Sequence, residues 1–107
     1  MATKNNNATV WVAYYRFEDR HGDAGMAIVG VFDSKDKAEA AKAKNIREYL
    51  RACEGIGPDG KINGNIDEID GETAEGMDLE AALEADSINV DSCGTWCEWD
   101  ISEEAVG

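Results

Sequence analysis

Long apolar runs, proline and histidine are nearly absent from this sequence, and its second half has almost no basic residues. No stretch approaches the roughly 20 consecutive apolar residues that a membrane-spanning helix needs, so we expect no membrane partner. The start of the chain, MATKNNNAT, is polar and lacks the charged-then-apolar pattern of a secretory signal. We therefore expect a cytoplasmic protein.

Cysteine is also scarce. Cys53, Cys93 and Cys97 are an odd number and too few for a disulfide scaffold, which favours a reducing compartment. Cys93 and Cys97 are separated by three residues rather than the two of a zinc knuckle or redox motif, and the sequence has no second pair. We interpret the cysteines as packed thiols and expect no metal and no cofactor.

The residues that nucleophilic or acid–base catalysis requires are not present as a set. The only histidine, His21, falls in a polar, glycine-bearing turn and is far along the chain from every cysteine. The sequence has no GxSxG elbow and no glycine-rich phosphate-binding loop between a strand and a helix. Carboxylates are so abundant that a pair at a catalytic separation would arise by chance. These observations favour a protein that is not an enzyme.

Acidic residues dominate the second half of the chain, and the net charge is −13. Residues 1–53 hold seven acidic against nine basic residues, a balance of +2, whereas residues 54–107 hold sixteen acidic against one basic residue, a balance of −15. Such an anionic half repels nucleic acids and attracts cations or basic protein surfaces. We therefore expect no direct binding of nucleic acid.

An apolar strand that runs directly into a capped helix is the best-specified part of the chain. Residues 26–32 form a continuous apolar run of strand length, and alternation places Met26 and Ile28 on one face and Val31 on the other. The aspartate or the serine that follows can cap the next helix. Residues 35–53 carry an apolar stripe on one side, which predicts a long amphipathic helix that covers a sheet.

The flanking segments complete a prediction of one α+β domain. Upstream, residues 10–17 alternate as a strand, and a polar turn returns the chain antiparallel as a hairpin. We expect a small antiparallel sheet in the order ββ-α-α-ββ, with the long helix packed on one face. Its parts are a disordered start (1–8), the hairpin and helix (9–53), an acidic glycine-rich loop (55–76), a short helix and the final strands (78–101) and a tail (102–107).

Part of the glycine-rich loop resembles a calcium-binding pattern. Asp59, Asn63, Asp67 and Asp70 occupy positions 1, 5, 9 and 12 of an EF-hand-like loop. Lys61 stands at position 3, where an oxygen ligand is needed, and Asp70 is shorter than the bidentate glutamate of position 12. A calcium-binding module at residues 59–70 is therefore an alternative and not the leading hypothesis.

The acidic surface itself is the remaining constellation. From residue 67 onward the acids recur every one to five residues, which on a folded surface gives carboxylates at spacings comparable with the phosphates of a nucleic-acid strand. Such an array could occupy the basic groove of a nucleic-acid-binding protein, with tryptophan adding contact area. The predicted partner-binding residues are Asp67, Glu68, Asp70, Glu72, Glu75, Asp78, Glu80, Glu84, Trp96 and Trp99. The two tryptophans fall on opposite faces of one strand, so we expect only one of them at the surface.

The segment IVGVFDSKDKAEAAKAKN, with the aromatic strand VWVAYYRF before it, resembles a group of small α+β domains of bacteria and their phages. In that group a hairpin ends in a G-V-[FY]-x-S-x-x-x-A-E joint that leads into a helix. The matching residues here are Gly30, Val31, Phe32, Ser34, Ala38 and Glu39. The resemblance covers residues 10–45 and implies a fold but no activity. The acidic composition is also similar in character to phage inhibitors of host defence, including anti-CRISPR and anti-restriction proteins that imitate nucleic acid.

These observations favour a phage-encoded, non-enzymatic inhibitor that acts in the cytoplasm of the host cell. Its acidic C-terminal half would dock on the basic nucleic-acid-binding surface of a host defence protein. The alternatives are the calcium module of residues 59–70 and a housekeeping domain whose acidity serves only solubility. Oligomeric state stays open.

Overall fold

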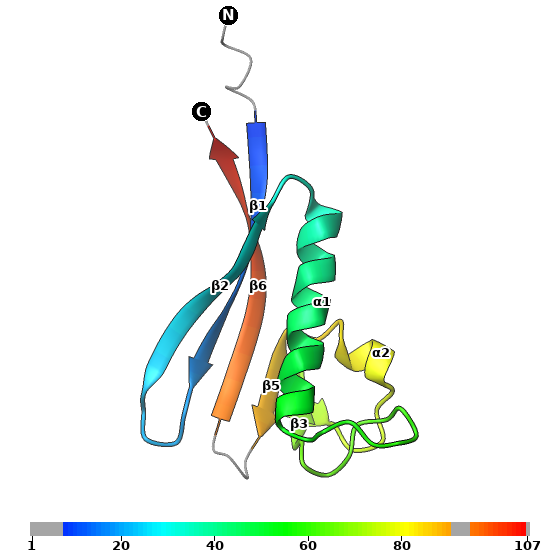
Figure 1. The fold of residues 1–107 in the computed structure, drawn as a ribbon. Helices are drawn as coiled ribbons and strands as arrows, with labels where there is room; N and C mark the ends of the chain where they lie inside the picture. Colours follow the sequence, from blue (N-terminus) through cyan, green and yellow to red (C-terminus); the bar gives the residue numbers. More distant parts are fainter. Residues whose placement is uncertain (1–7, 91–94, 107) are drawn as a thin grey trace, which may run out of the picture.

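The computed structural model describes residues 8–90 and 95–106, which form a six-stranded antiparallel sheet and two helices (Figure 1). The strands are β1 (Ala8–Glu18), β2 (Ala24–Phe32), β3 (Glu68–Ile69), β4 (Glu72–Thr73), β5 (Ser87–Val90) and β6 (Thr95–Val106). The helices are α1 (Lys35–Ala52) and α2 (Leu79–Ala82). The spatial order β2-β1-β6-β5-β3-β4 puts the last strand of the chain inside the sheet and leaves β2 and β4 at its edges.

The predicted α+β class and antiparallel sheet are confirmed, but the predicted order of elements is wrong. The described chain runs ββ-α-ββ-α-ββ, because the hairpin β3–β4 folds from the segment that we expected to be a loop. Helix α1 has 18 residues, about 27 Å at 1.5 Å per residue, whereas the longest dimension of the molecule is 57 Å. It covers only part of the sheet and is not long. Neither helix is long and apolar enough to cross a membrane, within the described ranges.

Several predicted boundaries also change. Strand β6 pairs with β1 as far as Val106 opposite Ala8, so the predicted tail 102–107 is strand up to Val106. Helix α2 is shorter than the predicted helix, which began at Asp78 and ended at Ala85. The predicted disordered start, apart from its last residue, and Cys93 lie outside the described residues.

A β-bulge in β2 changes which of its side chains share a face. Tyr14 lies opposite Ile28 and Val12 opposite Val31, with a shift of register between the two pairs. Directly opposed residues share a face, so Ile28 and Val31 point the same way, although unbroken alternation predicts opposite faces. We call this side of the sheet, which lies away from α1, the open face. Met26, Ile28 and Val31 are 61%, 61% and 59% exposed there.

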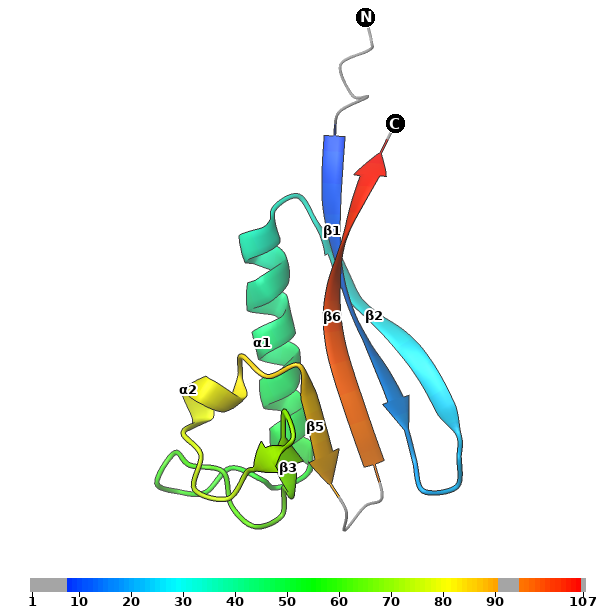
Figure 2. The ribbon, with the colours of Figure 1, turned by 180° about the vertical axis from the view of Figure 1, so that it is seen from behind.

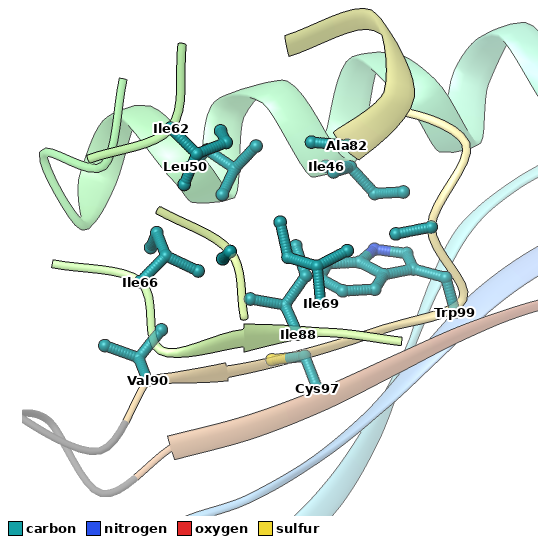
Figure 3. Close-up of a cluster of buried hydrophobic side chains, with 12 residues drawn as sticks. Ile46, Leu50, Ile62, Ile66, Ile69, Ala82, Ile88, Val90, Cys97 and Trp99 are labelled. Carbon is teal, nitrogen blue, oxygen red and sulfur yellow. The ribbon is translucent and has the colours of Figure 1, made fainter. Parts of the chain in front are cut away.

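The hydrophobic core lies between α1 and the part of the sheet made of β3, β5 and β6 (Figure 3). Ile46 and Leu50 from α1 are fully buried, as the predicted apolar stripe requires. They face Ile88 of β5 and Trp99 of β6, which are 0% and 2% exposed. This core holds α1 and α2 on the same side of the sheet, and Figures 1 and 2 both show the turn end of the β1–β2 hairpin standing clear of the helices.

Residues 55–76 belong to the core and are not a loose loop. Ile62, Ile66 and Ile69 are at most 2% exposed and pack in the same cluster as α1. Asp70 and Gly71 have φ values of 53° and 81° and form the two-residue turn between β3 and β4, as a type I′ hairpin turn requires. The segment that carries much of the acidic charge is therefore an ordered part of the fold.

Both ends of α1 are capped by local hydrogen bonds. The Ser34 hydroxyl accepts a hydrogen bond from the Lys37 N–H at 3.2 Å, so the serine and not Asp33 is the N-cap. At the other end the N–H of Gly55 donates to the carbonyl of Leu50 at 2.8 Å, the longer bond of a Schellman motif. The residue in the left-handed position of this motif is Glu54, with φ of 54°.

We expect Glu54→Gly to stabilise the protein by about 0.5–1 kcal/mol. A left-handed conformation is disfavoured by about 1–2 kcal/mol for a residue with a Cβ, and the greater freedom of glycine in the unfolded chain offsets part of the gain. Urea denaturation followed by circular dichroism measures the change. Glu48→Gly, at an exposed position inside α1, is the control and should destabilise by about 1 kcal/mol. Destabilisation by both substitutions would contradict the prediction.

Candidate acidic binding surface

Three of the predicted binding residues border a groove beside helix α2. Asp78, Glu80 and Glu84 are exposed and line a cavity of about 620 Å³. The residues that line it are Gly60, Asp78, Leu79, Glu80, Ala81 and Glu84. We call this cavity the acidic groove. It is held in place because Ala82 of α2 is fully buried in the core, while the N–H of Leu79 donates to the carbonyl of Gly60 at 3.2 Å.

Lys61 neutralises only one of the groove acids. Its ammonium nitrogen lies 2.9 Å from Oδ1 of Asp78, and this hydrogen bond and charge lower the pKa of Asp78 and raise the pKa of Lys61. Asp78 therefore faces Lys61, and its side chain makes no capping hydrogen bond to α2. Glu80 and Glu84 form no ion pair with any residue in the described part of the chain. The groove thus keeps a net negative charge.

The negative surface continues from the groove toward α1, where it includes Glu39, which the sequence analysis did not assign to it. Glu84 also borders a second cavity, of about 510 Å³, which Glu39 of α1 and Asp86 line as well. Lys42 Nζ lies 2.8 Å from Asp86 Oδ1 and joins α1 to the chain after α2. Glu39 could not be predicted as part of this surface, because it belongs to the half of the chain with a balance of +2 and no local pattern places it near Glu84.

Glu68 and Trp96 lie on a different surface, the open face. Strand pairing sets Glu68 opposite Asn89 and Asn89 opposite Trp96, so the three form a row across β3, β5 and β6. Trp96 is 38% exposed, whereas Trp99, on the other face of β6, is 2% exposed and packs against Tyr49. Trp99 is a core residue and leaves the predicted binding set.

Asp70 and Asp67 are engaged by the protein itself. Oδ1 of Asp70 accepts hydrogen bonds from the backbone N–H groups of Asp86 and Ser87 at 2.8 and 3.0 Å, which ties the β3–β4 turn to the start of β5. Asp67 is half-buried, and its N–H donates to the carbonyl of Asn89 at 3.1 Å. The positions of these two aspartates thus have a structural explanation, and they contribute less to a docking surface than the groove glutamates.

The predicted residues consequently do not form a single array. Glu72 is exposed on edge strand β4, opposite the buried Ile69, and Glu75 is exposed with its carboxylate close to Gly64. The acids are divided between the acidic groove, the β4 edge and the open face. Of these, the groove has the strongest claim to be a site, because it combines concavity with exposed carboxylates.

Backbone N–H groups donate to two side-chain oxygen atoms of the alternative calcium loop. Asp59 Oδ1 accepts the N–H of Lys61 at 3.1 Å, and Asn63 Oδ1 accepts the N–H of Asn65 at 2.9 Å. These are the local turns that aspartate and asparagine form with the backbone two residues on. Among residues 8–90 and 95–106, no three His, Cys, Asp or Glu side chains are grouped as metal ligands. Oδ1 of Asp59 and Oδ1 of Asn63 thus each stabilise a local turn.

Tyr49 and Cys97 have raised pKa values because both groups are largely buried. Burial raises the pKa of Tyr49, and the neighbouring Cys97 and Cys53 thiols raise it further. Burial also raises the pKa of Cys97, so this thiol stays protonated at neutral pH. A nucleophilic or metal-binding cysteine needs the thiolate, which a lowered pKa favours. These contacts support the interpretation of Cys97 as a packed thiol.

Comparisons with protein-family models, with curated proteins and with solved structures find no match to this chain. Function therefore has to be argued from the surface, and the resemblance to small phage and bacterial domains stays a prediction.

Proposed function

We propose that this chain is a non-enzymatic binding protein, encoded by a phage, whose acidic groove docks on the basic nucleic-acid-binding surface of a host defence protein. Binding there competes with the nucleic acid and inhibits the partner. One observation supports this proposal most. Glu80 and Glu84 are exposed, line the acidic groove and form no ion pair within the described residues.

Long-range charge supports the same proposal. Residues 54–107 carry a balance of −15, which is large for a segment of this size. A field of one sign steers an oppositely charged partner and raises the association rate. Because charges further apart than about 10 Å are screened at 0.1 M ionic strength, the proposed complex forms more slowly and binds more weakly as salt rises.

The groove also suits a basic partner in its shape. Leu79 and Ala81 line it together with the acids and contribute apolar surface. An arginine or lysine side chain can lay its aliphatic stem on such apolar atoms and direct its charged end to a carboxylate. Basic grooves that bind nucleic acid are rich in these two residues.

The test begins with a pull-down from bacterial lysate at about 50 mM salt and again at about 500 mM, a range across which the screening length falls severalfold. We expect recovery of a nucleic-acid-binding protein that is lost at high salt and displaced by added DNA or RNA. Recovery only of partners that are insensitive to salt and to nucleic acid would contradict the proposal.

The recovered partner then allows the groove to be tested directly. We expect the double substitution Glu80→Gln and Glu84→Gln to weaken binding by about tenfold at low salt, which corresponds to about 0.7 kcal/mol for each lost charge. The control is Glu103→Gln with Glu104→Gln, which removes the same charge from exposed positions near the end of β6. An equal loss in both double variants would assign the effect to net charge and not to the groove.

A further inference from the structure

The two edges of the sheet differ in length and in charge. Edge strand β4 has two residues, Glu72–Thr73, and one of them is acidic. Edge strand β2, Ala24–Phe32, has nine residues and contains neither a charged residue nor a proline. Sheets usually protect their edges with short strands, charges or prolines, because an open edge offers unpaired N–H and C=O groups to another strand. Strand β4 is protected by its short length and its charge, whereas β2 has only the bulge at Val29, which leaves Ala24–Ile28 without such protection.

The apolar side chains of β2 are also exposed. Met26 and Ile28 are each 61% exposed on the open face. Together with Val12, Tyr14 and Arg16 of β1 and Ser102 and Glu104 of β6, they line a shallow cavity of about 370 Å³. In a chain with 31% charged residues, the nine residues of β2 are all uncharged, so β2 is the less polar of the two edge strands. This surface is unsuited to the charged partner of the acidic groove.

We propose that β2 pairs with β2 of a second copy of this chain, giving a symmetric dimer with one continuous sheet. The paired part is Ala24–Ile28, the regular stretch before the bulge. Antiparallel pairing centred on Met26 sets it opposite Met26 of the partner subunit, and Ile28 opposite Ala24 of the partner subunit. The same residues of β2 then form the contact on both subunits, as two-fold symmetry requires.

The charge distribution favours a second copy as the occupant. Each copy carries −13, so self-association requires an approach that keeps the acidic halves apart. Strand β2 is at the opposite end of the strand order from β3 and β4, and it belongs to the half of the chain with a balance of +2. Pairing at β2 therefore joins the least acidic edges, and it leaves an acidic groove free on each subunit. The proposal does not depend on what the groove binds.

Analytical ultracentrifugation of the full chain across about 1–500 μM tests the proposal, a range that covers the weak to moderate affinities expected of a small edge contact. We expect a monomer of 11.6 kDa to shift to twice that mass as concentration rises. Higher salt should strengthen the dimer, because it screens the repulsion between two anionic subunits. This is opposite to the salt dependence proposed for the groove, so the two proposals can fail separately.

Matched lysine substitutions locate the contact. Met26→Lys places like charges opposite each other at the centre of the pairing and should weaken the dimer by about tenfold or more. Val31→Lys is the control, since Val31 is 59% exposed on the same strand and face but lies beyond the bulge. Should Met26→Lys not fold by circular dichroism, Ile28→Lys supplies the same test. A chain that stays monomeric throughout, or a dimer that these substitutions leave unchanged, would overturn the proposal.

Discussion

Replacing Trp99 by alanine is expected to lower the free energy of unfolding by about 3–5 kcal/mol, the range typical of a fully buried aromatic residue. Trp99 is 2% exposed and is the largest of the buried side chains in the core (Figure 3). Its indole N–H donates to Asn45 Oδ1 at 2.8 Å, and its ring meets that of Tyr49 edge-on at 5.5 Å. Because small domains are stable by only about 5–15 kcal/mol, this loss is a large fraction of the total stability. Urea denaturation followed by far-ultraviolet circular dichroism measures the loss.

Trp96→Ala is the matched control for this substitution. Trp96 is 38% exposed on the opposite face of the same strand, so its removal leaves no cavity and should destabilise by less than about 1 kcal/mol. Trp99→Phe separates the two contributions of Trp99, because it keeps an aromatic ring and leaves the Asn45 oxygen without its donor. Equal losses in the free energy of unfolding for Trp99→Ala and Trp96→Ala would contradict the prediction, because the buried tryptophan would then contribute no more than the exposed one.

The hairpin and helix could be predicted from sequence because their determinants are local. The apolar run, the capping serine and the stripe of α1 lie within a few turns of one another, and each favours the same structure. A cap at Asp33 or Ser34 and the buried Ile46 and Leu50 follow directly from this pattern, and the structure has the cap at Ser34. The bulge in β2 could not be predicted in this way, since it depends on the register with β1, and it reversed the face assigned to Val31.

The β3–β4 hairpin carried a signal that the prediction did not use. Asp70-Gly71 is an aspartate–glycine pair, a strong indicator of a two-residue hairpin turn. We interpreted Asp70 as a partner-binding residue or, alternatively, as position 12 of an EF-hand-like loop, and the acidic residues that flank the turn do not suggest strands. Strands of two residues are stable only through pairing with β5 and burial of Ile69, and neither contact is visible in the local sequence.

The candidate site was predictable in charge but not in shape. Sequence alone indicated which half of the chain is acidic and which residue types stand in it. The acidic residues are divided between the acidic groove, the β4 edge and the open face. Strand register places Glu68 on the open face, whereas Glu80 and Glu84 line the groove. Glu39 joined the groove region only through the packing of α1 beside α2.

Ile66→Ala is expected to lower the free energy of unfolding by about 2–4 kcal/mol, as for other buried isoleucines. Ile66 is 1% exposed and belongs to the segment that the sequence suggested was a loose loop, where the same substitution would have almost no effect. Gly55→Ala should also destabilise, by about 1–3 kcal/mol, because a Cβ at Gly55 would lie 2.5 Å from Cγ1 of Ile66. Urea denaturation of both single variants and of the double variant completes a thermodynamic cycle.

The double variant shows whether the two single losses arise from one contact between Gly55 and Ile66 or from independent effects. The new methyl group at Gly55 occupies space that Ile66→Ala vacates, so the double variant should lose less than the sum of the single losses, by at least about 1 kcal/mol. Strictly additive losses would mean that the two residues are not in contact. Coupling would show that Ile66 packs against Gly55, whose N–H donates to the carbonyl of Leu50 at the end of α1. Because Gly60 and Lys61 of this segment bind the start of α2, a packed segment also holds the acidic groove in one shape before any partner arrives.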